Sequence, residues 1–542
     1  MTRPATLSPM VSGRLLRSAF KLLPVDQALP KSGLVQASTT RSRPWGWLTC
    51  IFVLQLSFFS FLSLHRFIDG DEGFYLLASR LVLLHKRPYL DFFYTQAPLL
   101  PYVYGLGMKL AGVTWVSGRL LAALFTAVLG TMLCQHVHLQ TGNWRAGLLV
   151  VVLFATTTLI FAWFPVVKAF SLAGVFLFAA YVVVSSCQNR PLPWPAALAG
   201  LLFGLSVDTR SYLLLLTPLF LYHIYRNYEA KARKTSLLWF VVGLLVANLP
   251  AFYFFLLSPR VFLFNNLGFH AIRSGNGLVA LWGQKLVTIV VALLGSKEGN
   301  GIQATLLLVI SLAFVSSLHD RSYPPRFAFQ LAVAIAFISL LPTPVLIQYF
   351  CLCIPFLLVS TVCVANELLL ELRARRTKWL AIIGFTLIAG LYFAASIPDF
   401  QKYFVTGGFV PDPADWSLQR VGEISRAIDQ TTSPGEPVAS FWPGDVFQTH
   451  AISFPGFEND FGLPISEALT SEQRTRFHLL SPGEIQSDFA AHQPRVVVLR
   501  QEVFSPPDKP HIANIFRGFL AAQGYRVVRS IGGVSIYVYG PK

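Results

Sequence analysis

The sequence has very little acid through most of its length. Of its 26 Asp and Glu residues, 15 lie from Asp399 onward, so only 11 remain in the first 398 residues. Charged residues of both signs make up only 13% of the chain, whereas 54% of the residues are hydrophobic. This composition excludes an ordinary soluble protein and is typical of a polytopic α-helical membrane protein.

Cysteine is also scarce, and several motifs that carry chemistry are missing. The chain has six cysteines, none after Cys363, so no disulfide framework is expected in the C-terminal part. Cys351 and Cys353 have no accompanying His or second pair, and we interpret them as core or lipid-facing residues. The sequence has no P-loop, nucleophile elbow or zinc-spaced His/Cys set. We therefore predict no cofactor and no metal ligands, although nothing in the sequence excludes a divalent metal.

The basic residues do not indicate a nucleic-acid partner. The formal net charge is +17, but Lys and Arg are scattered at the ends of apolar runs and form no single patch with interleaved aromatic residues. Membrane topology explains them better, because they concentrate in the short loops of one side. The lipid bilayer is thus the expected environment, and no nucleic acid is expected to bind.

Apolar runs divide the first part of the chain into expected membrane spans. The run from Trp45 to Leu64 is uncharged and long enough to cross about 30 Å of hydrocarbon. We predict about eleven transmembrane helices, with a basic cytoplasmic tail over residues 1–44, a transmembrane module over 45–396 and an external soluble α/β domain over 397–542. The N-terminus then lies inside and the C-terminal part outside. The predicted spans begin near Trp45, Ser117, Arg145, Ala169, Ala196, Ser211, Ser236, Ile302, Phe327, Phe350 and Trp379.

The C-terminal part has a soluble composition, with 15 acids against 12 Lys and Arg from Asp399 onward. Helical periodicity alternates there with short apolar runs suited to buried strands, and the last two runs flank a Gly-Gly pair that is typical of a hairpin. The predicted elements are helices at Trp416–Gln430 and Ile512–Ala522, strands at Pro437–Phe441 and Arg495–Leu499, and a hairpin of Tyr525–Arg529 with Val534–Tyr539.

Three carboxylates lie just after the first apolar run, in a predicted external loop over residues 66–116. Asp69, Asp71 and Glu72 fall within four positions. Ionisable residues at a membrane edge are candidates for chemistry, and a carboxylate can act as the general base that takes a proton from an acceptor hydroxyl. The alternative is helix capping, since Asp69 or Asp71 before a helix would stabilise its N-terminus by about 1 kcal/mol.

The stretch that follows has an amphipathic pattern. Phe74, Leu77, Leu81 and Leu84 fall on one helical face. This pattern predicts a helix that lies in the membrane interface and keeps Arg80 in water. Elsewhere, Gly200 and Gly204 are spaced G-x-x-x-G, which predicts close helix packing.

The motifs of the first loop resemble those of a known family. Asp71-Glu72-x-x-Tyr75 is followed by Pro88-Tyr89-Leu90-Asp91-Phe92-Phe93 and by Gln96-Ala97-Pro98-Leu99. In this order they resemble the first external loop of the GT-C fold glycosyltransferases that use polyprenyl-phosphate sugars. That superfamily includes protein O-mannosyltransferases, lipid A aminoarabinose transferases and Rgt-type lipopolysaccharide glycosyltransferases. The resemblance extends to about residue 396, through Lys168, residues 200–210, residues 269–273 and Gln348-Tyr349.

The resemblance implies a multi-pass glycosyltransferase of the bacterial inner membrane. Such an enzyme transfers a sugar from a polyprenyl-phosphate donor to a hydroxyl of a glycan, lipid or protein on the external face, in lipopolysaccharide, cell-envelope glycan or protein glycosylation. It implies Asp71 as the catalytic base, with Glu72 beside it and Asp91 as a second acid of the loop. Asp69 is a further candidate for the base. The expected substrate-binding residues are Asp69, Tyr75, Gln96, Lys168, Arg210, His270, Arg273, Gln348 and Tyr349.

The leaving polyprenyl phosphate requires a cation to hold its developing charge. Lys168, Arg210 and Arg273 share the predicted external side with Asp71. We expect at least one of them in a cavity with Asp71, on the order of 6 to 12 Å from its carboxylate and too far for a direct ion pair.

Each of these residues also has a structural alternative. Lys168 could snorkel at a helix end, Arg210 could pair with Asp208, and the loop of Arg273 could simply connect two spans. A hydrogen-bonded structural role is the alternative for His270, and an aromatic-belt role is the alternative for Tyr349.

Two other functions stay open at the level of the sequence. A transporter would share the spans and the charges, but its usual internal repeats and mid-bilayer ionisable residues are not apparent. An envelope assembly or binding protein, anchored by the spans, would leave the polar and patterned first loop unexplained.

Overall fold

The computed structural model describes residues 45–186, 193–273, 278–294, 302–315, 324–373, 378–408, 410, 412–500 and 512–540. The predicted tail over residues 1–44 lies outside these ranges. From Leu48 onward the described residues belong to one compact unit, and the features described below lie in it.

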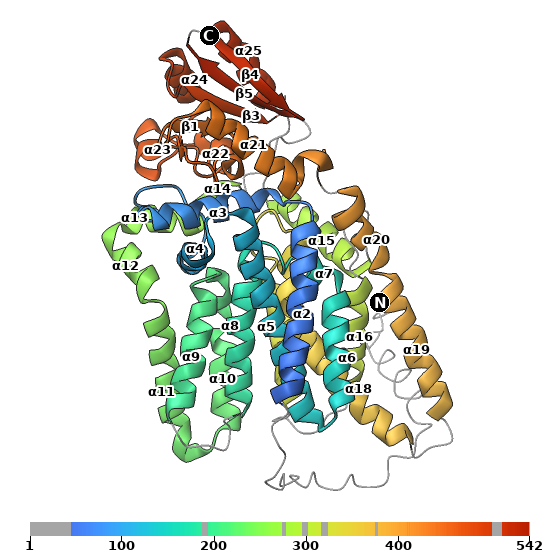
Figure 1. Cartoon of the computed structure of the whole chain (residues 1–542). Helices are drawn as coiled ribbons and strands as arrows, with labels where there is room; N and C mark the ends of the chain where they lie inside the picture. Colours follow the sequence, from blue (N-terminus) through green and yellow to red (C-terminus); the bar gives the residue numbers. More distant parts are fainter. Residues whose placement is uncertain are drawn as a thin grey trace, which may run out of the picture. The chain divides into compact units, whose positions relative to one another are not determined.

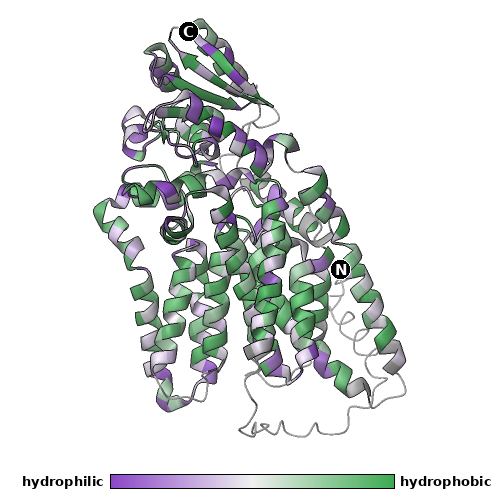
Figure 2. Cartoon of the chain, viewed as in Figure 1, coloured by the Kyte–Doolittle hydropathy of each residue, from purple (hydrophilic) through white to green (hydrophobic). Residues whose placement is uncertain are grey.

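Apolar helices form the body of this unit, and many of them run side by side (Figure 1). Their residues are mostly hydrophobic along their length, with hydrophilic residues near their ends (Figure 2). The helices of this part are α2 (Trp45–His65), α5 (Trp115–Thr141), α6 (Trp144–Thr156), α7 (Thr158–Phe161), α8 (Ala169–Ser186), α9 (Pro193–Val207), η1 (Ser211–Leu216), α10 (Thr217–Asn227), α11 (Ala230–Ala247), α12 (Leu249–Leu257), α15 (Leu278–Leu294), α16 (Ile302–Val315), α17 (Pro324–Ile338), η3 (Ile347–Cys353), α18 (Ile354–Arg373) and α19 (Lys378–Ala394).

The chain is a multi-pass membrane protein. Within the described ranges, five helices are long and apolar enough to cross a membrane, and a sixth span is added if α11 and α12, which are bent by 54° at their junction, count as one. The predicted count of eleven spans is therefore not confirmed. Several apolar helices, among them α6 and α9, have fewer than 18 residues. In addition, α15 forms a helix where the sequence predicted no span.

Glycines allow α9 and α11 to approach closely. A Cβ atom at Gly200 would lie 1.9 Å from the carbonyl oxygen of Phe240, and one at Gly204 would lie 2.8 Å from that of Leu244. No side chain fits in this space, so the predicted packing role of the G-x-x-x-G pattern is confirmed.

A second group of elements lies across one end of these helices (Figure 1). The apolar residues of α3 and α4 share one core with residues of the segment 254–269 and with residues of the C-terminal part, such as Trp416 and Trp442. The elements of this group are α3 (Gly70–Leu83), α4 (Leu99–Ala111), α13 (Pro259–Leu263), η2 (Phe264–Gly268), α14 (Phe269–Arg273), α20 (Ile397–Gln401) and η4 (Lys402–Thr406).

The C-terminal part contains one mixed five-stranded sheet with the order β2-β1-β3-β5-β4. β1 pairs in parallel with β2 and β3, whereas β5 is antiparallel to β3 and β4. The predicted helices, strands and hairpin are confirmed within one or two residues, and Gly532 supplies the positive φ of the hairpin turn. The elements are η5 (Pro413–Trp416), α21 (Leu418–Thr431), β1 (Pro437–Ser440), η6 (Pro443–Asp445), β2 (Ile452–Ser453), α22 (Leu463–Ser466), α23 (Ser471–Phe477), α24 (Pro482–Ala490), β3 (Val496–Arg500), α25 (Ile512–Ala522), β4 (Tyr525–Ile531) and β5 (Val534–Tyr539).

The C-terminal part packs directly on α3. Arg80 donates hydrogen bonds to the carbonyl oxygens of Val446, Phe447 and Ala451, at 2.9, 3.1 and 2.8 Å. The indole of Trp442 donates to the carbonyl of Gly70 at 2.8 Å. The expectation that Arg80 lies in water is therefore wrong, because its guanidinium is bonded to the C-terminal part, and most residues of α3 are buried.

We expect Gly73→Ala to weaken this packing. A Cβ atom at residue 73 would lie 2.7 Å from the backbone nitrogen of Gly444 and 2.9 Å from the Trp442 ring. Overpacking of this kind lowers the free energy of unfolding by about 1–3 kcal/mol, which thermal unfolding in detergent would measure. The matched control is Gly384→Ala, also in a helix, where a Cβ meets nothing within 4 Å. Equal stability of the two variants would contradict the tight contact.

Candidate active site

The three clustered carboxylates have three different surroundings. Asp69 is the N-cap of α3, and its side chain accepts a hydrogen bond from the backbone N–H of Asp71 at 3.1 Å. Glu72 completes a capping box by accepting from the backbone N–H of Asp69 at 2.9 Å. The capping alternative is thus correct for Asp69, with Glu72 completing the box, while the side chain of Asp71 takes no part in the cap.

Glu72 is an anchor of the fold. Its carboxylate is fully buried and forms an ion pair with Arg119, with contacts of 2.7 and 3.0 Å, and it also accepts from the backbone N–H of Val167 at 3.1 Å. Arg119 in turn donates to the carbonyl oxygens of Ser63 and Arg66. These bonds tie the start of α3 to α2, α5 and the segment before α8. Glu72, predicted beside the base as a catalytic residue, has all its contacts in this network.

Asp71 faces a cavity and is held by Lys168. The Lys168 ammonium lies 2.9 Å from Asp71 Oδ2 and 2.7 Å from Asp69 Oδ1, and it donates to Gln348 Oε1 at 2.5 Å. Lys168 is 2% exposed, so it does not snorkel. The expected separation of 6 to 12 Å between carboxylate and cation is wrong for Lys168, because the ammonium pairs directly with both carboxylates.

This arrangement separates the two aspartates electrostatically. Although burial opposes the shift, the cations of Lys168 and Arg66 lower the pKa of Asp69. Burial, together with the negative charge of Asp69, raises the pKa of Asp71 against the effect of Lys168. Asp71 is therefore the more basic carboxylate of the pair, as a proton acceptor needs to be.

Nine of the predicted site residues line one cavity of about 230 Å³. They come from α3, the loop after it, the segment before α8, the start of η1, α14 and η3. The nine residues are Asp71, Tyr75, Gln96, Lys168, Arg210, His270, Arg273, Gln348 and Tyr349. The other three predicted residues do not line the cavity. Asp69 is linked to it only by its ion pair with Lys168, whereas Glu72 pairs with Arg119 and Asp91 pairs with Arg87.

Arg210 lies in this cavity among aromatic rings. Its guanidinium carbon lies 4.5 Å from the Phe170 centroid, 5.0 Å from that of Tyr212 and 5.3 Å from that of Tyr349. The predicted alternative, a pair with Asp208, is wrong, because both carboxylate oxygens of Asp208 lack a hydrogen-bond partner in the described part of the chain. The aromatic rings hold the guanidinium in place without neutralising it. Tyr349 belongs to this group, so the aromatic-belt alternative does not describe it.

Arg273 and His270 enter the cavity from α14. The guanidinium of Arg273 packs over the rings of Phe269 and Phe461, at 5.4 and 5.3 Å. Burial, aided by the charges of Arg273 and Arg210, lowers the pKa of His270 to about 4. The imidazole is therefore neutral at pH 7, and the positive charge on this side of the cavity comes from the two arginines.

Asp91 lies outside the cavity. It forms a local ion pair with Arg87 at 3.1 Å and also accepts from the backbone N–H of Arg87 at 2.7 Å. Asp71 lines the cavity, whereas Asp91 is not among its lining residues. The structure therefore does not bring together the two acids that the family resemblance placed in one site.

The C-terminal part adds a residue that the sequence did not indicate. Phe461 lines the cavity and contacts Phe74 of α3, with ring centroids 5.4 Å apart. An Asn-x-x-Gly turn is visible at residues 459–462, but nothing in the sequence indicates that this turn reaches the first loop. Among the described residues, no group of three or more His, Cys, Asp or Glu side chains could hold a metal ion.

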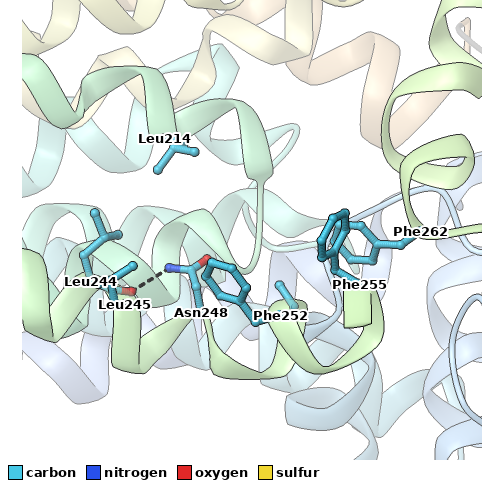
Figure 3. A pocket seen from close by; sticks show the side chains of 8 residues that line it. Leu214, Leu244, Leu245, Asn248, Phe252, Phe255 and Phe262 are labelled. Atoms are coloured by element: carbon cyan, nitrogen blue, oxygen red, sulfur yellow. Dashed lines mark hydrogen bonds between the residues drawn. The ribbon is translucent and has the colours of Figure 1, made fainter. Parts of the chain in front are cut away.

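A second, wholly apolar cavity of about 350 Å³ lies between η1, the bent pair of α11 and α12, and α13 (Figure 3). Its walls include Leu214, Leu245, Phe252 and Phe262, and the amide of Asn248 is turned back to the carbonyl of Leu244 at 2.8 Å. Arg210 is the N-cap of η1 and Leu214 is its fourth residue, so one short helix joins the apolar cavity to the charged one.

Comparison with known proteins identifies the fold. No protein-family model matches the sequence, and no curated protein sequence matches it. The structure is similar to that of ArnT, an aminoarabinose transferase, from Cupriavidus metallidurans bound to undecaprenyl phosphate, with a TM-score of 0.64 and 13% identity over 92% of this chain and 100% of that chain. The apo state of ArnT gives a TM-score of 0.63 at 14% identity, over 92% and 99% of the two chains.

A weaker similarity links the chain to the archaeal oligosaccharyltransferase AglB from Archaeoglobus fulgidus, in complex with an inhibitory peptide and a dolichol-phosphate. The TM-score is 0.46 at 15% identity, over 91% of this chain and 74% of that chain. Both relatives are GT-C fold glycosyltransferases. Because the similarity to ArnT covers nearly the whole of both chains, the protein described here has the GT-C fold.

Proposed function

We propose that the protein is an integral-membrane glycosyltransferase that takes a sugar from a polyprenyl-phosphate donor. The observation that carries the proposal is the single cavity in which the carboxylate of Asp71 lies with Lys168, Arg210 and Arg273. A base and phosphate-binding cations are the two requirements of this transfer. In ArnT, a protein of the same fold, the bound ligand is undecaprenyl phosphate.

The proposed reaction uses each side of the cavity differently. The acceptor hydroxyl gives its proton to Asp71 while its oxygen forms a bond to the anomeric carbon of the sugar. The bond between that carbon and the phosphate oxygen breaks, and its electron pair leaves with the polyprenyl phosphate. Arg210 and Arg273 hold the phosphate charge, while Lys168 positions Asp71 through the ion pair at 2.9 Å.

The apolar cavity accommodates the first isoprenoid units of the donor in this proposal. Its lining has no polar exposed surface, which suits a hydrocarbon chain and excludes a sugar. The short helix η1 places Arg210 near the phosphate and Leu214 near the isoprenoid chain. These two residues are four positions apart, which corresponds to about 8 Å at the rise of about 2 Å per residue of a 3₁₀ helix.

The cellular setting follows from the same proposal. The donor would be a polyprenyl-phosphate sugar of the bacterial inner membrane, and the acceptor a hydroxyl of a glycan, lipid or protein in lipopolysaccharide, envelope glycan or protein glycosylation. The charged residues gather at one end of the apolar helices, which suits chemistry on the external face, with the C-terminal part outside and the N-terminus in the cytoplasm. A transporter would instead place them along a central path.

Release of lipid phosphate tests the proposal directly. Purified protein is offered a panel of polyprenyl-phosphate sugars with candidate acceptors, and the polyprenyl phosphate formed is measured. Turnover of at least one donor is expected, with inhibition by undecaprenyl phosphate. Absence of both turnover and lipid-phosphate binding would overturn the proposal.

We further expect Arg273→Gln to weaken inhibition by undecaprenyl phosphate by about 10-fold, since a charge-assisted hydrogen bond to phosphate is lost. The control is Arg260→Gln, which removes an exposed arginine of the neighbouring helix α13 and should leave the inhibition unchanged. An equal loss in both variants would mean that the effect reflects overall charge and not the cavity.

A further inference from the structure

Arg273 places a positive charge at the cavity on a side chain that its own helix does not fix. It is the last residue of α14, a helix of five residues, and it is exposed. An exposed arginine has many rotamers, and holding it in one of them costs conformational entropy. A guanidinium that binds a phosphate at a defined point of the cavity therefore needs neighbours that restrict it.

Two aromatic rings restrict the guanidinium of Arg273. Its central carbon lies 5.4 Å from the ring centroid of Phe269 and 5.3 Å from that of Phe461. Phe269 begins the same helix and is buried, with its ring centroid 5.5 Å from that of Phe93. An aromatic face attracts a cation but carries no net charge. The two rings therefore hold the guanidinium and leave its charge available to an anion.

Phe461 comes from the C-terminal part and is itself fixed in position. Its turn is closed by a hydrogen bond from the Gly462 N–H to the Asn459 carbonyl at 3.3 Å. The Asn459 side chain also accepts from the backbone N–H of Phe461 at 3.0 Å. The ring packs edge-to-face on Phe74 of α3, with centroids 5.4 Å apart. A Cβ at Gly462 would lie 2.3 Å from Leu479, so the backbone of the turn also lies directly against its neighbours.

The other two cations of the cavity are held without the C-terminal part. Lys168 is held by the carboxylates of Asp69 and Asp71. The rings around Arg210 belong to Phe170, Tyr212 and Tyr349. Among the described residues that line the cavity, only Phe461 belongs to the C-terminal part. Its contact with Arg273 is thus the point at which this part acts on the charge of the cavity.

We propose that Phe461 is a positioning residue of the phosphate site, whose ring orients the guanidinium of Arg273 toward the phosphate of the donor lipid. The inference rests on the proposed function and deepens it, because it makes the C-terminal part complete the phosphate-binding side of the cavity. A protein without this ring keeps the charge of Arg273 but loses its orientation.

A double-mutant cycle tests the inference. Dissociation constants for undecaprenyl phosphate are measured for the whole wild-type protein, for Phe461→Leu, for Arg273→Gln and for the double variant. Phe461→Leu keeps an apolar side chain but has no aromatic face, so affinity is expected to fall about 3- to 5-fold, the range of an exposed cation–π contact. In the Arg273→Gln background the same change should have no effect, because the cation that the ring orients is absent.

Further variants separate positioning from packing. Phe461→Tyr keeps the aromatic face and should bind undecaprenyl phosphate as wild type does. Phe454→Leu is the matched control, since it changes a half-buried ring of the same C-terminal part that packs on Phe457, and it should also bind as wild type does. Thermal unfolding verifies the fold of each variant. Phe461→Met, which also lacks a ring, takes the place of Phe461→Leu if that variant does not fold.

The outcomes keep this test separate from that of the proposed function. Wild-type affinity of Phe461→Leu, or an equal loss in the wild-type and Arg273→Gln backgrounds, would overturn the inference alone. A loss in Phe461→Tyr as large as that in Phe461→Leu would overturn it as well, because the aromatic face would not be the cause. A wild-type protein that neither binds undecaprenyl phosphate nor turns over a sugar lipid would overturn the proposed function, and the inference with it.

Discussion

Asp71→Asn is expected to lower turnover by about 10² to 10⁴-fold, the usual contribution of a general base. The carboxamide keeps the shape of the side chain but cannot take the acceptor proton. Stability should change little, since the side chain of Asp71 makes no hydrogen bond in the cap of α3 and a quarter of it, 26%, is exposed. Release of polyprenyl phosphate under saturating donor measures the effect, and thermal unfolding verifies the fold.

Two comparisons sharpen the experiment. Asp91→Asn is the matched control, because Asp91 pairs with Arg87 outside the cavity, and it should retain nearly full turnover. The pKa of Asp71 is raised, so the base becomes protonated, and turnover falls, at a higher pH than for an ordinary aspartate. Near wild-type turnover by Asp71→Asn would remove the role of base from this residue, and loss of turnover in Asp91→Asn would return Asp91 to the chemistry.

The sequence predicts the candidate cavity better than the roles of its acids. Lys168, Arg210 and Arg273 are far apart in the chain, yet the sequence predicts that they share the external side with Asp71, and all three line the cavity. The roles depend on distances that a pattern does not contain. Glu72 and Asp71 are neighbours in sequence, but α3 turns one toward Arg119 and the other toward the cavity.

The fold, like the site, is predictable from the sequence where neighbouring residues determine it, and not where contacts between distant residues do. Local signals are sufficient for α21, α25 and the hairpin of β4 and β5, because periodicity and a Gly-Gly turn determine them. The docking of the C-terminal part on α3 depends on contacts such as that of Arg80 with Val446, which join residues more than 360 positions apart. Membrane spans are predicted by apolar length, but the bend between α11 and α12 interrupts a single run.

The separation of roles between Asp71 and Glu72 leads to a second large effect. We expect Glu72→Ala to lower the free energy of unfolding by about 3–5 kcal/mol, because removing one partner of a buried pair leaves the other charge uncompensated. Arg119 is fully buried and would keep only its bonds to backbone carbonyl groups. The backbone N–H groups of Asp69 and Val167 would lose their acceptor as well.

The matched control is Glu423→Ala, which removes one partner of a partly exposed pair with Arg420 in α21 and should change stability by less than about 1 kcal/mol. Thermal or denaturant-induced unfolding in detergent measures both variants. The double variant Glu72→Ala/Arg119→Met should recover part of the lost stability, because it removes the uncompensated charge together with its partner. A Glu72→Ala protein with wild-type stability but no turnover would contradict the anchoring role and would make Glu72 a participant in catalysis, as its place beside the base in the Asp-Glu-x-x-Tyr motif implies.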